Sequence, residues 1–513
     1  MRTKACLLAG AALCALAMPA SASKQNDTLV WAISQEAPSI DPYYSQTRES
    51  VVMYRNVCDN LLYREPKTGE YKAGLALAHR WVNDLTLEFD LRPGVVFHDG
   101  RKFSAADVAY TFNHVSNPDN AVIAQSNVKW IQSAEAIGED KVRVHLKEPF
   151  PAALEYVSGP LPILPAGHYD KAPPFRAGGQ GKAPKDFGAV KTICTGPYKV
   201  KSIDPGEGVT LTKHDRYFDG PRPKPVIGTV QIRTIPDLDT QLALLMTGQL
   251  DLIWDVAPDK AKQLQSRKTL SVKQVSISRL NYLQLDAAGR GGKTPMQDLR
   301  VRRAMNHAVN KQAIAKGLVG EVSEIIHAAC YPTQFGCTQD VPRYDYDPEK
   351  AKKLLGEAGV PDGFEVDLYS YRQRDYAEAV IGDLAKVGIK ARLRMLQYEV
   401  LRPKWRSGEA QLIQGSWASY GMNDTSGSAS YFFRGSPDDL AQDKQVIDWL
   451  TVADTNTDPA VRKENYRKAL ERIAEQAYWV PLFTSAKYYA MSAQLDFTPY
   501  ADDLPQFSAS RWK

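Results

Sequence analysis

Two arginines within residues 369–376 have side chains suited to holding an acidic molecule. The planar guanidinium of Arg372 or Arg374 can bind a carboxylate through two parallel hydrogen bonds. The alternative is a surface ion pair with Asp375 or Glu378, which needs no ligand. The sequence leaves both interpretations open for each arginine, and it predicts that at least one of the two meets an acidic group.

A second segment, residues 415–424, combines aromatic and polar side chains. Trp417 and Tyr420 have flat apolar rings with a polar edge, a combination found in binding pockets and equally in cores. Asn423 and Asp424 can face a ligand, or they can be ordinary turn residues ahead of Thr-Ser-Gly. We therefore treat this segment as a candidate binding loop.

Motifs of catalysis are missing from the sequence. It contains neither a Gly-x-Ser-x-Gly nucleophile elbow nor a His-Glu-x-x-His metal pair. Acidic residues are plentiful, but a sequence cannot show that two of them face each other across a cleft. We predict no catalytic residue and no enzymatic activity; a secreted hydrolase is the alternative.

The eight histidines do not form a metal site in the sequence. They are scattered, and no pair has ligand spacing on a helix. We predict no metal ligand and no cofactor, although a metal carried by a small chelator would need few protein ligands. The histidines are His79, His98, His114, His145, His168, His214, His307 and His327.

The first residues have the pattern of an export signal. Arg2 and Lys4 precede the uncharged stretch 5–18, and small residues at 20–22 offer a cleavage site. The apolar stretch is shorter than the ~20 residues that a membrane-spanning helix needs. We expect a signal peptide at residues 1–22 and a protein that is free in the periplasm.

Charge argues against a nucleic-acid partner. The formal net charge is +5, and it falls to +3 when Arg2 and Lys4 leave with the signal peptide. A nearly neutral chain of 513 residues offers no basic surface for a polyanion. The cluster of Arg300, Arg302 and Arg303 is interpreted as the solvated face of a helix.

Four cysteines remain after the predicted cleavage: Cys58, Cys194, Cys330 and Cys337. In an oxidising compartment the last two, which are close in sequence, are expected to form a local disulfide. Two free buried thiols are the alternative. The state of Cys58 and Cys194 stays open.

Residues 81–112 predict a strand, a turn and a helix. Apolar and polar residues alternate over 85–91, which is the period of a half-buried strand, and Arg-Pro-Gly at 92–94 ends it. Ser104 followed by Asp107 makes a capping box at the start of a helix. Taken alone, this strand-turn-helix unit is found in many α/β proteins and indicates no particular function.

The same run, from Trp81 to Phe112, resembles the signature of family 5 extracellular solute-binding proteins, the ligand-capturing subunits of peptide, nickel and opine ABC importers. Residues 195–200, 279–286, 346–359 and 479–483 resemble further segments of that family. Together these matches span nearly the whole mature chain.

The resemblance implies an α/β fold: a two-lobed periplasmic binding protein of class II, cluster C type, with an inserted subdomain. Lobe I is expected to comprise residues 23–54, 193–278 and 488–513, with residues 55–192 as its inserted subdomain. Lobe II is expected at residues 279–487. A cleft between two such lobes can close over a ligand that stabilises the closed state.

The resemblance also suggests the binding residues. Peptide-binding members use an aspartate in a Trp-x-Ala-Asp-Tyr segment to bind the amino terminus of the ligand, but Ser419 stands at that position here. A hydroxyl cannot replace the charge pairing, so an ordinary free-amino peptide is a less secure ligand. The predicted ligand-binding residues are Trp417, Ser419, Tyr420, Asn423, Asp424, Arg372 and Arg374.

We therefore expect a periplasmic subunit of an ABC importer that captures a peptide-like or amino-acid-conjugate solute. Its partners would be that solute and the permease, and it would act as a monomer without nucleic acid. Within the same fold, a nickel or metallophore carrier and an opine-like ligand remain alternatives.

Overall fold

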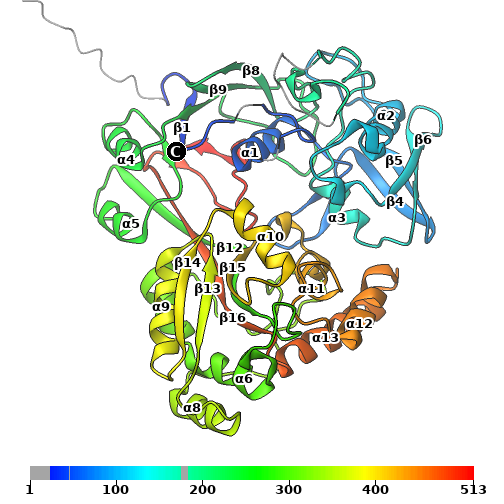
Figure 1. The fold of residues 1–513 in the computed structure, drawn as a ribbon. Coiled ribbons are helices and arrows are strands. Elements are labelled where there is room, and N and C mark those ends of the chain that lie inside the picture. Colours follow the sequence, from blue (N-terminus) through cyan, green and yellow to red (C-terminus); the bar gives the residue numbers. More distant parts are fainter. Residues whose placement is uncertain (1–23, 38, 46, 175–182) are drawn as a thin grey trace, which may run out of the picture.

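The computed structural model describes residues 24–513 apart from residues 38, 46 and 175–182, so the predicted signal peptide lies outside the described residues. The ribbon has two lobes, one built from both ends of the chain and the other from its later middle part (Figure 1). We call them lobe I and lobe II, using the ranges given above. Within the described part of the chain, no helix is long and apolar enough to cross a membrane.

One mixed sheet of ten strands extends through both lobes, in the order β14-β13-β15-β12-β16-β11-β1-β10-β9-β8. Strands on its lobe I side are β1 Thr28–Ile33, β8 Tyr198–Asp204, β9 Gly208–Lys213, β10 Thr229–Thr234 and β11 Leu252–Ile253. The others are β12 Leu270–Leu285, β13 Glu365–Ser370, β14 Lys390–Met395, β15 Leu412–Trp417 and β16 Trp479–Ser492.

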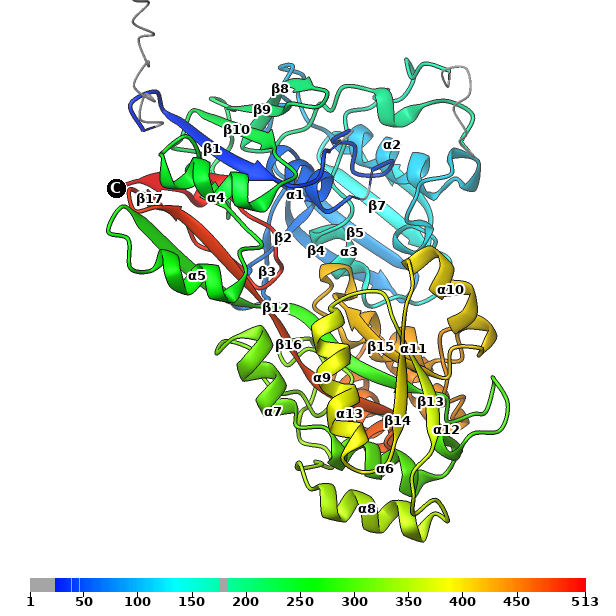
Figure 2. The same cartoon turned by 60° about the vertical axis from the view of Figure 1, so that its left-hand side comes forward.

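The two longest strands, β12 and β16, connect the lobes (Figure 2). They pair antiparallel with each other, while β16 also pairs with β11 in lobe I and β12 with β15 in lobe II. Their register shifts between Ile277 and Leu280 and again between Asn281 and Tyr282. Residues 280–285 of β12 are all buried, so this part of the strand runs through the interior.

The inserted subdomain is built around a four-stranded antiparallel sheet. Leu87, Phe89 and Leu91 are buried as predicted, but Leu85 lies just before the strand and is exposed. The Asp107 carboxylate accepts a hydrogen bond from the Ser104 backbone at 2.7 Å, as a capping box requires. The elements are β2 Leu62–Arg64, β3 Tyr71–Ala73, β4 Ala76–Asn83, β5 Thr86–Leu91, β6 Ile131–Ala136, β7 Lys141–Leu146, α2 Ala105–Ser116 and α3 Ala153–Ser158.

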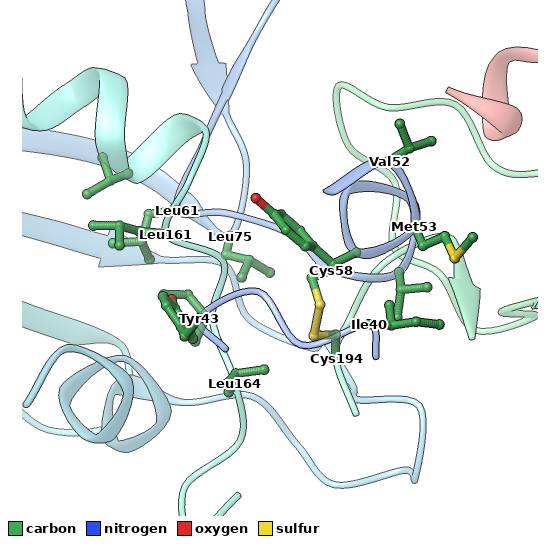
Figure 3. Close-up of a cluster of buried hydrophobic side chains, with 14 of the residues drawn as sticks. Ile40, Tyr43, Val52, Met53, Cys58, Leu61, Leu75, Leu161, Leu164 and Cys194 are labelled. Carbon is green, nitrogen blue, oxygen red and sulfur yellow. A yellow bond between two sulfur atoms is a disulfide. The ribbon is translucent and has the colours of Figure 1, made fainter. Parts of the chain in front are cut away.

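A single hydrophobic cluster joins the subdomain to the rest of lobe I. Figure 3 shows its centre, with Ile40, Val52 and Met53 on one side, Leu61 and Leu161 of the subdomain on the other, and Leu75 and Cys58 between them. Because no polar layer separates the two, the subdomain and lobe I share one core and should move together. Other elements of lobe I are α1 Arg48–Val57, α4 Leu238–Met246, α5 Pro258–Leu264, β17 Leu495–Asp496 and β18 Arg511–Trp512.

Lobe II packs helices against its part of the sheet. Tyr282 of β12 stacks on Trp479 of β16, with ring centroids 3.7 Å apart, in one of its two cores. Its helices are α6 Leu299–Ala308, α7 Lys311–Ile314, α8 Pro348–Glu357, α9 Arg374–Ala385, α10 Tyr398–Ser407, α11 Ala429–Phe433, α12 Lys444–Thr455 and α13 Pro459–Glu475.

One prediction for α6 is wrong. Arg300 and Arg303 are exposed or partly exposed, but Arg302 is only 4 % exposed. Its guanidinium donates hydrogen bonds to the backbone carbonyls of Met296, Gln297 and Gln476. The arginine is buried because these three carbonyls replace water around its charge.

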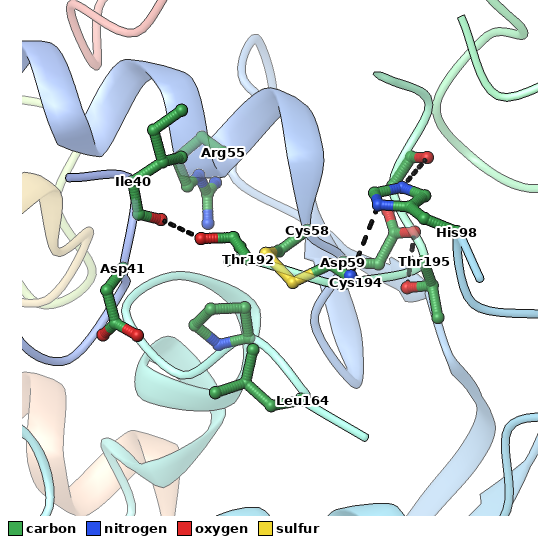
Figure 4. Close-up of a disulfide and its surroundings, with 12 residues drawn as sticks. Ile40, Asp41, Arg55, Cys58, Asp59, His98, Leu164, Thr192, Cys194 and Thr195 are labelled. Atoms are coloured by element: carbon green, nitrogen blue, oxygen red, sulfur yellow. Dashed lines mark hydrogen bonds between the residues drawn. A yellow bond between two sulfur atoms is a disulfide. The ribbon is translucent and has the colours of Figure 1, made fainter. Parts of the chain in front are cut away.

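Two disulfides are present among the described residues. Cys330 is bonded to Cys337, the predicted pair, and Cys58 is bonded to Cys194, whose state the sequence left open. The second bond joins residues 136 positions apart (Figure 4). Beside it, His98 accepts from the Cys194 amide, and burial lowers the pKa of His98 to about 3.

Candidate functional site

The predicted binding residues gather where lobe II faces lobe I. Strand β15 ends at Trp417 and continues into residues 418–424, which we call the interlobe loop. This loop carries four of the seven predicted residues. Arg372 follows the neighbouring strand β13, which pairs with β15 in parallel, so both strands end at the same edge of the sheet.

Trp417 is fixed in its position by lobe II. Its ring stacks on Tyr431 with centroids 4.3 Å apart and meets Phe432 edge-on. Its indole nitrogen donates to the Gly427 carbonyl at 2.7 Å. The side chain is still partly exposed, so one part of this rigid aromatic surface remains available to a ligand.

The first residues of the interlobe loop form a short turn, Ser419–Gly421. Ser419 has a positive φ of 49° and is 3 % exposed, so its hydroxyl lies beneath the surface of the loop. Tyr420 belongs to the same turn, but its side chain lies outside the described ones. Asn423 engages through its backbone, whose amide donates to Glu155 at 2.7 Å and whose carbonyl accepts from Phe335.

Asp424 is held inside lobe II by a network of charges. Its carboxylate accepts from Arg462 at 2.7 Å and lies 3.1 Å from the Tyr466 hydroxyl. It also accepts from the backbone of Ser426, as in the turn that the sequence offered as the alternative. The carboxylate is 2 % exposed, so its negative charge is already balanced within the protein.

The two candidate arginines differ in their surroundings. Arg374 forms an ion pair with Glu378 at 2.8 Å on the exposed face of α9, which is the structural interpretation left open by the sequence. Arg372 forms no ion pair among the described residues, and its guanidinium lies 5.6 Å from the ring centroid of Tyr371. Arg372 is therefore the better-placed candidate.

Sequence reasoning missed a third arginine, Arg279 on the crossing strand β12. It donates to the Ser416 hydroxyl at 3.3 Å, and among the described residues it forms no contact ion pair, although the Asp503 carboxylate lies close enough to attract it. Burial, followed by the proximity of Arg372, lowers the pKa of Arg279. The signal was visible, because Arg279 is the one charged residue between Lys273 and Asp286.

A charged network on the lobe I side was also missed. Asp503 pairs with Arg48 at 2.7 Å and with Lys487 at 3.0 Å, and Lys487 also pairs with Asp255. The Arg48 guanidinium lies 3.7 Å from the ring centroid of Trp254. These residues come from four separate segments, so no local pattern could have joined them. Burial raises the pKa of Asp503 to about 6.

Hollows elsewhere in the described part of the molecule lie away from the predicted binding residues. Among the described residues, no group of three or more histidines, cysteines or acids could hold a metal ion. A cavity in lobe I beside Arg55 and Asp502 measures about 20 Å³, which is room for about one water molecule. A more open hollow of about 340 Å³ lies on lobe II beside Lys293, Asp298 and Val360, and none of the predicted binding residues lines it. The interlobe region is therefore the candidate for binding a solute.

Comparison with known proteins agrees with this arrangement. The family described as bacterial extracellular solute-binding proteins, family 5 Middle, matches residues 70–439. The glutathione-binding protein GsiB of Salmonella paratyphi A is 27% identical over 500 residues, which cover 93% of this chain and 92% of that protein.

Solved structures share the fold. DppA of Helicobacter pylori, in complex with the peptide STSA, has a TM-score of 0.75 at 23% identity, covering 95% of this chain and 99% of DppA. NikA of Brucella suis, in complex with Fe(III)-EDTA, has a TM-score of 0.78 at 22% identity, covering 95% of this chain and 100% of NikA. With the family match extending over most of its length, the chain belongs to family 5 of the bacterial extracellular solute-binding proteins.

Proposed function

We propose that this protein is the periplasmic solute-binding subunit of an ABC importer and that its solute is peptide-like or an amino-acid conjugate bearing at least one carboxylate. The solute would bind between the lobes and pass unchanged to the permease. The names of the relatives support this class: GsiB is a glutathione-binding protein, and DppA was solved with a peptide.

The observation that carries the proposal is the pair Arg279 and Arg372. The two guanidinium groups lie close enough to repel each other, and neither forms a contact ion pair among the described residues, although Asp503 partly offsets the charge of Arg279. A ligand carboxylate between them would remove that repulsion and form charge-assisted hydrogen bonds. Arg279 comes from the crossing strand and Arg372 from lobe II, so such a ligand would sit beside the hinge.

Ser419 narrows the ligand class further. The position where peptide binders place an aspartate is neutral here, and Asp424 is neutralised by Arg462. We propose that the ligand is not held through a free α-amino group at this loop, so that its carboxylates dominate recognition. This favours a conjugate with two carboxylates, such as a γ-linked peptide, over an ordinary dipeptide with one. Trp417 would line its apolar part.

The direct test is to purify the protein from its native host and identify the co-purified molecule by mass spectrometry. Calorimetry with reduced glutathione, a free-amino dipeptide, an opine and nickel would then rank the candidates. We expect an acidic, peptide-like molecule and tighter binding of glutathione than of the dipeptide. A purely apolar or metal-only yield, or turnover of any candidate, would reject the proposal.

An acidic metal chelate is the second candidate. NikA of Brucella suis was solved with Fe(III)-EDTA, and a polycarboxylate chelator would satisfy the same two arginines. The two candidates separate in one experiment: a chelate must bring metal into the co-purified material, whereas a conjugate binds equally well after treatment with a chelating resin.

The remaining features of the proposal concern the whole protein. We propose that residues 1–22 are a cleaved signal peptide, that the mature protein is a non-catalytic monomer, and that its lobes and subdomain follow the predicted ranges. Size-exclusion chromatography with light scattering and amino-terminal sequencing of the mature protein would test these points.

A further inference from the structure

Three consecutive residues of the interlobe loop are held by lobe I, although the loop belongs to lobe II. The Gly421 carbonyl accepts from Arg64 at 2.6 Å, and the Asn423 amide donates to Glu155 at 2.7 Å. Between them, Met422 is 8 % exposed and, of the lobe II residues that the structure describes, it alone belongs to the hydrophobic cluster of lobe I.

The receiving residues form a compact group within the inserted subdomain. Arg64 lies at the end of β2 and pairs with Glu155 of α3 at 2.8 Å, and Tyr71 of β3 donates to the same carboxylate. Glu155 is only 4 % exposed, so its charge is buried and depends on these partners. Gly69, in the turn between β2 and β3, leaves space against the Asn423 side chain that a Cβ would fill.

The opposite side of the loop is anchored in lobe II. Gln334 donates to the Met422 carbonyl at 2.9 Å, and the Phe335 amide donates to the Asn423 carbonyl. Asp424 is fixed by Arg462. The loop is thus a rigid projection of lobe II, and its tip fits into the subdomain.

We infer that Arg64, Glu155 and the Met422 site position the interlobe loop and stabilise the closed arrangement of the lobes, so the subdomain contributes to ligand retention without touching the ligand. The inference rests on the proposed function, because it takes the loop next to Ser419 as part of the binding site. A contact that holds the two lobes together in the ligand-free protein raises the fraction of molecules competent to hold ligand. Losing it should therefore increase the dissociation rate.

The test compares Glu155→Gln and Met422→Ala with two matched controls. Arg80→Gln removes an ion pair with Glu88 in the same subdomain, and Met395→Ala removes an exposed methionine of lobe II. We expect about tenfold faster dissociation of glutathione in the two test variants, the scale of one charged hydrogen bond, and less than twofold in the controls.

A second readout needs no ligand. Hydrogen exchange of the ligand-free protein should show at least tenfold lower protection at residues 421–424 in Glu155→Gln, with β16 unchanged as evidence of an intact fold. Unchanged protection in that variant would overturn the inference, as would wild-type dissociation rates in both test variants. If the wild-type protein does not bind glutathione, that ligand is rejected while the exchange result still decides on the loop.

Discussion

Two charged regions of lobe II, one around Asp424 and one around Arg279, differ in how their charges are paired. Around Asp424, every charge has a partner: Arg462 pairs with Asp424, and Arg434 pairs with Asp454 at 2.5 Å. Around Arg279, the guanidinium donates to a hydroxyl and forms no contact ion pair among the described residues; its neighbour Arg372 has the same sign, and the attraction of Asp503 is the smaller of the two charge effects. The first region is complete without a ligand, whereas the second is not.

This difference separates structural from functional charge. A buried ion pair stabilises a particular arrangement only when both partners are present. Like charges held together have a cost in the empty protein, which a ligand of opposite charge can recover as binding energy. Asp424, which the sequence placed among ligand candidates, thus has the surroundings of a structural residue, and Arg279 has those of a ligand-binding one.

The largest expected effect is on stability and comes from removing one partner of the ion pair between Asp424 and Arg462. Arg462→Leu leaves the Asp424 carboxylate buried without its cation, so we expect the free energy of unfolding to fall by about 3–5 kcal/mol. Urea denaturation would measure it. The exposed Arg374→Leu serves as control and should cost less than about 1 kcal/mol. A fall that small for Arg462→Leu would show that water or another donor replaces the arginine.

A smaller effect follows from pH, because the complete region contains one carboxylate that resists ionisation. Burial raises the pKa of Asp454 from 3.8 to about 6. A raised carboxyl pKa means that the folded state binds the proton more tightly than the unfolded state, so stability from this group is present at pH 4 and lost as the pH rises to 6.

Asp454→Asn mimics the protonated form and should remove this dependence. The unfolding free energy of the wild type relative to the variant should fall by up to about 3 kcal/mol between pH 4 and 7. Denaturation at several pH values would follow it, with the exposed Asp239→Asn as control. A constant difference would mean that Asp454 is ionised throughout.

The incomplete region should respond in binding rather than in stability. Arg279→Met keeps an unbranched apolar side chain but removes the guanidinium and its charge, so we expect affinity for an acidic ligand to fall by about 2 kcal/mol. Because the repulsion with Arg372 also disappears, the ligand-free protein should be no less stable than the wild type. Loss of stability with unchanged calorimetric affinity would place Arg279 among the structural charges instead.

The two original candidate arginines give the finest comparison. Arg372→Ala should weaken binding of an acidic ligand by at least about 1.5 kcal/mol, while Arg374→Ala, already paired with Glu378, should change it by less than about 0.5 kcal/mol. Calorimetric measurement of ligand affinity in both variants would test this difference. Equal effects, or none, would remove the distinction drawn here.

Sequence reasoning reached the fold and family because local patterns carry them. The capping box at Ser104 and the alternation around Phe89 are readable over a few residues, and both are present in the structure. The contacts of the candidate site were harder to predict from the sequence. The partner of Asp424 is 38 positions away at Arg462, and Asp503 meets Arg48 from the other end of the chain. Such pairs are set by topology, which a single sequence does not encode locally.

The uneven register of β12 and β16 has a mechanical consequence. Irregular pairing weakens a ladder locally, so bending costs least between Ile277 and Tyr282, where the two strands slip twice. We therefore expect the hinge between the lobes in this irregular segment, which contains Arg279. Any rotation of one lobe against the other therefore also reorients the Arg279 guanidinium, so the proposed ligand contact and the lobe movement are coupled at the same position.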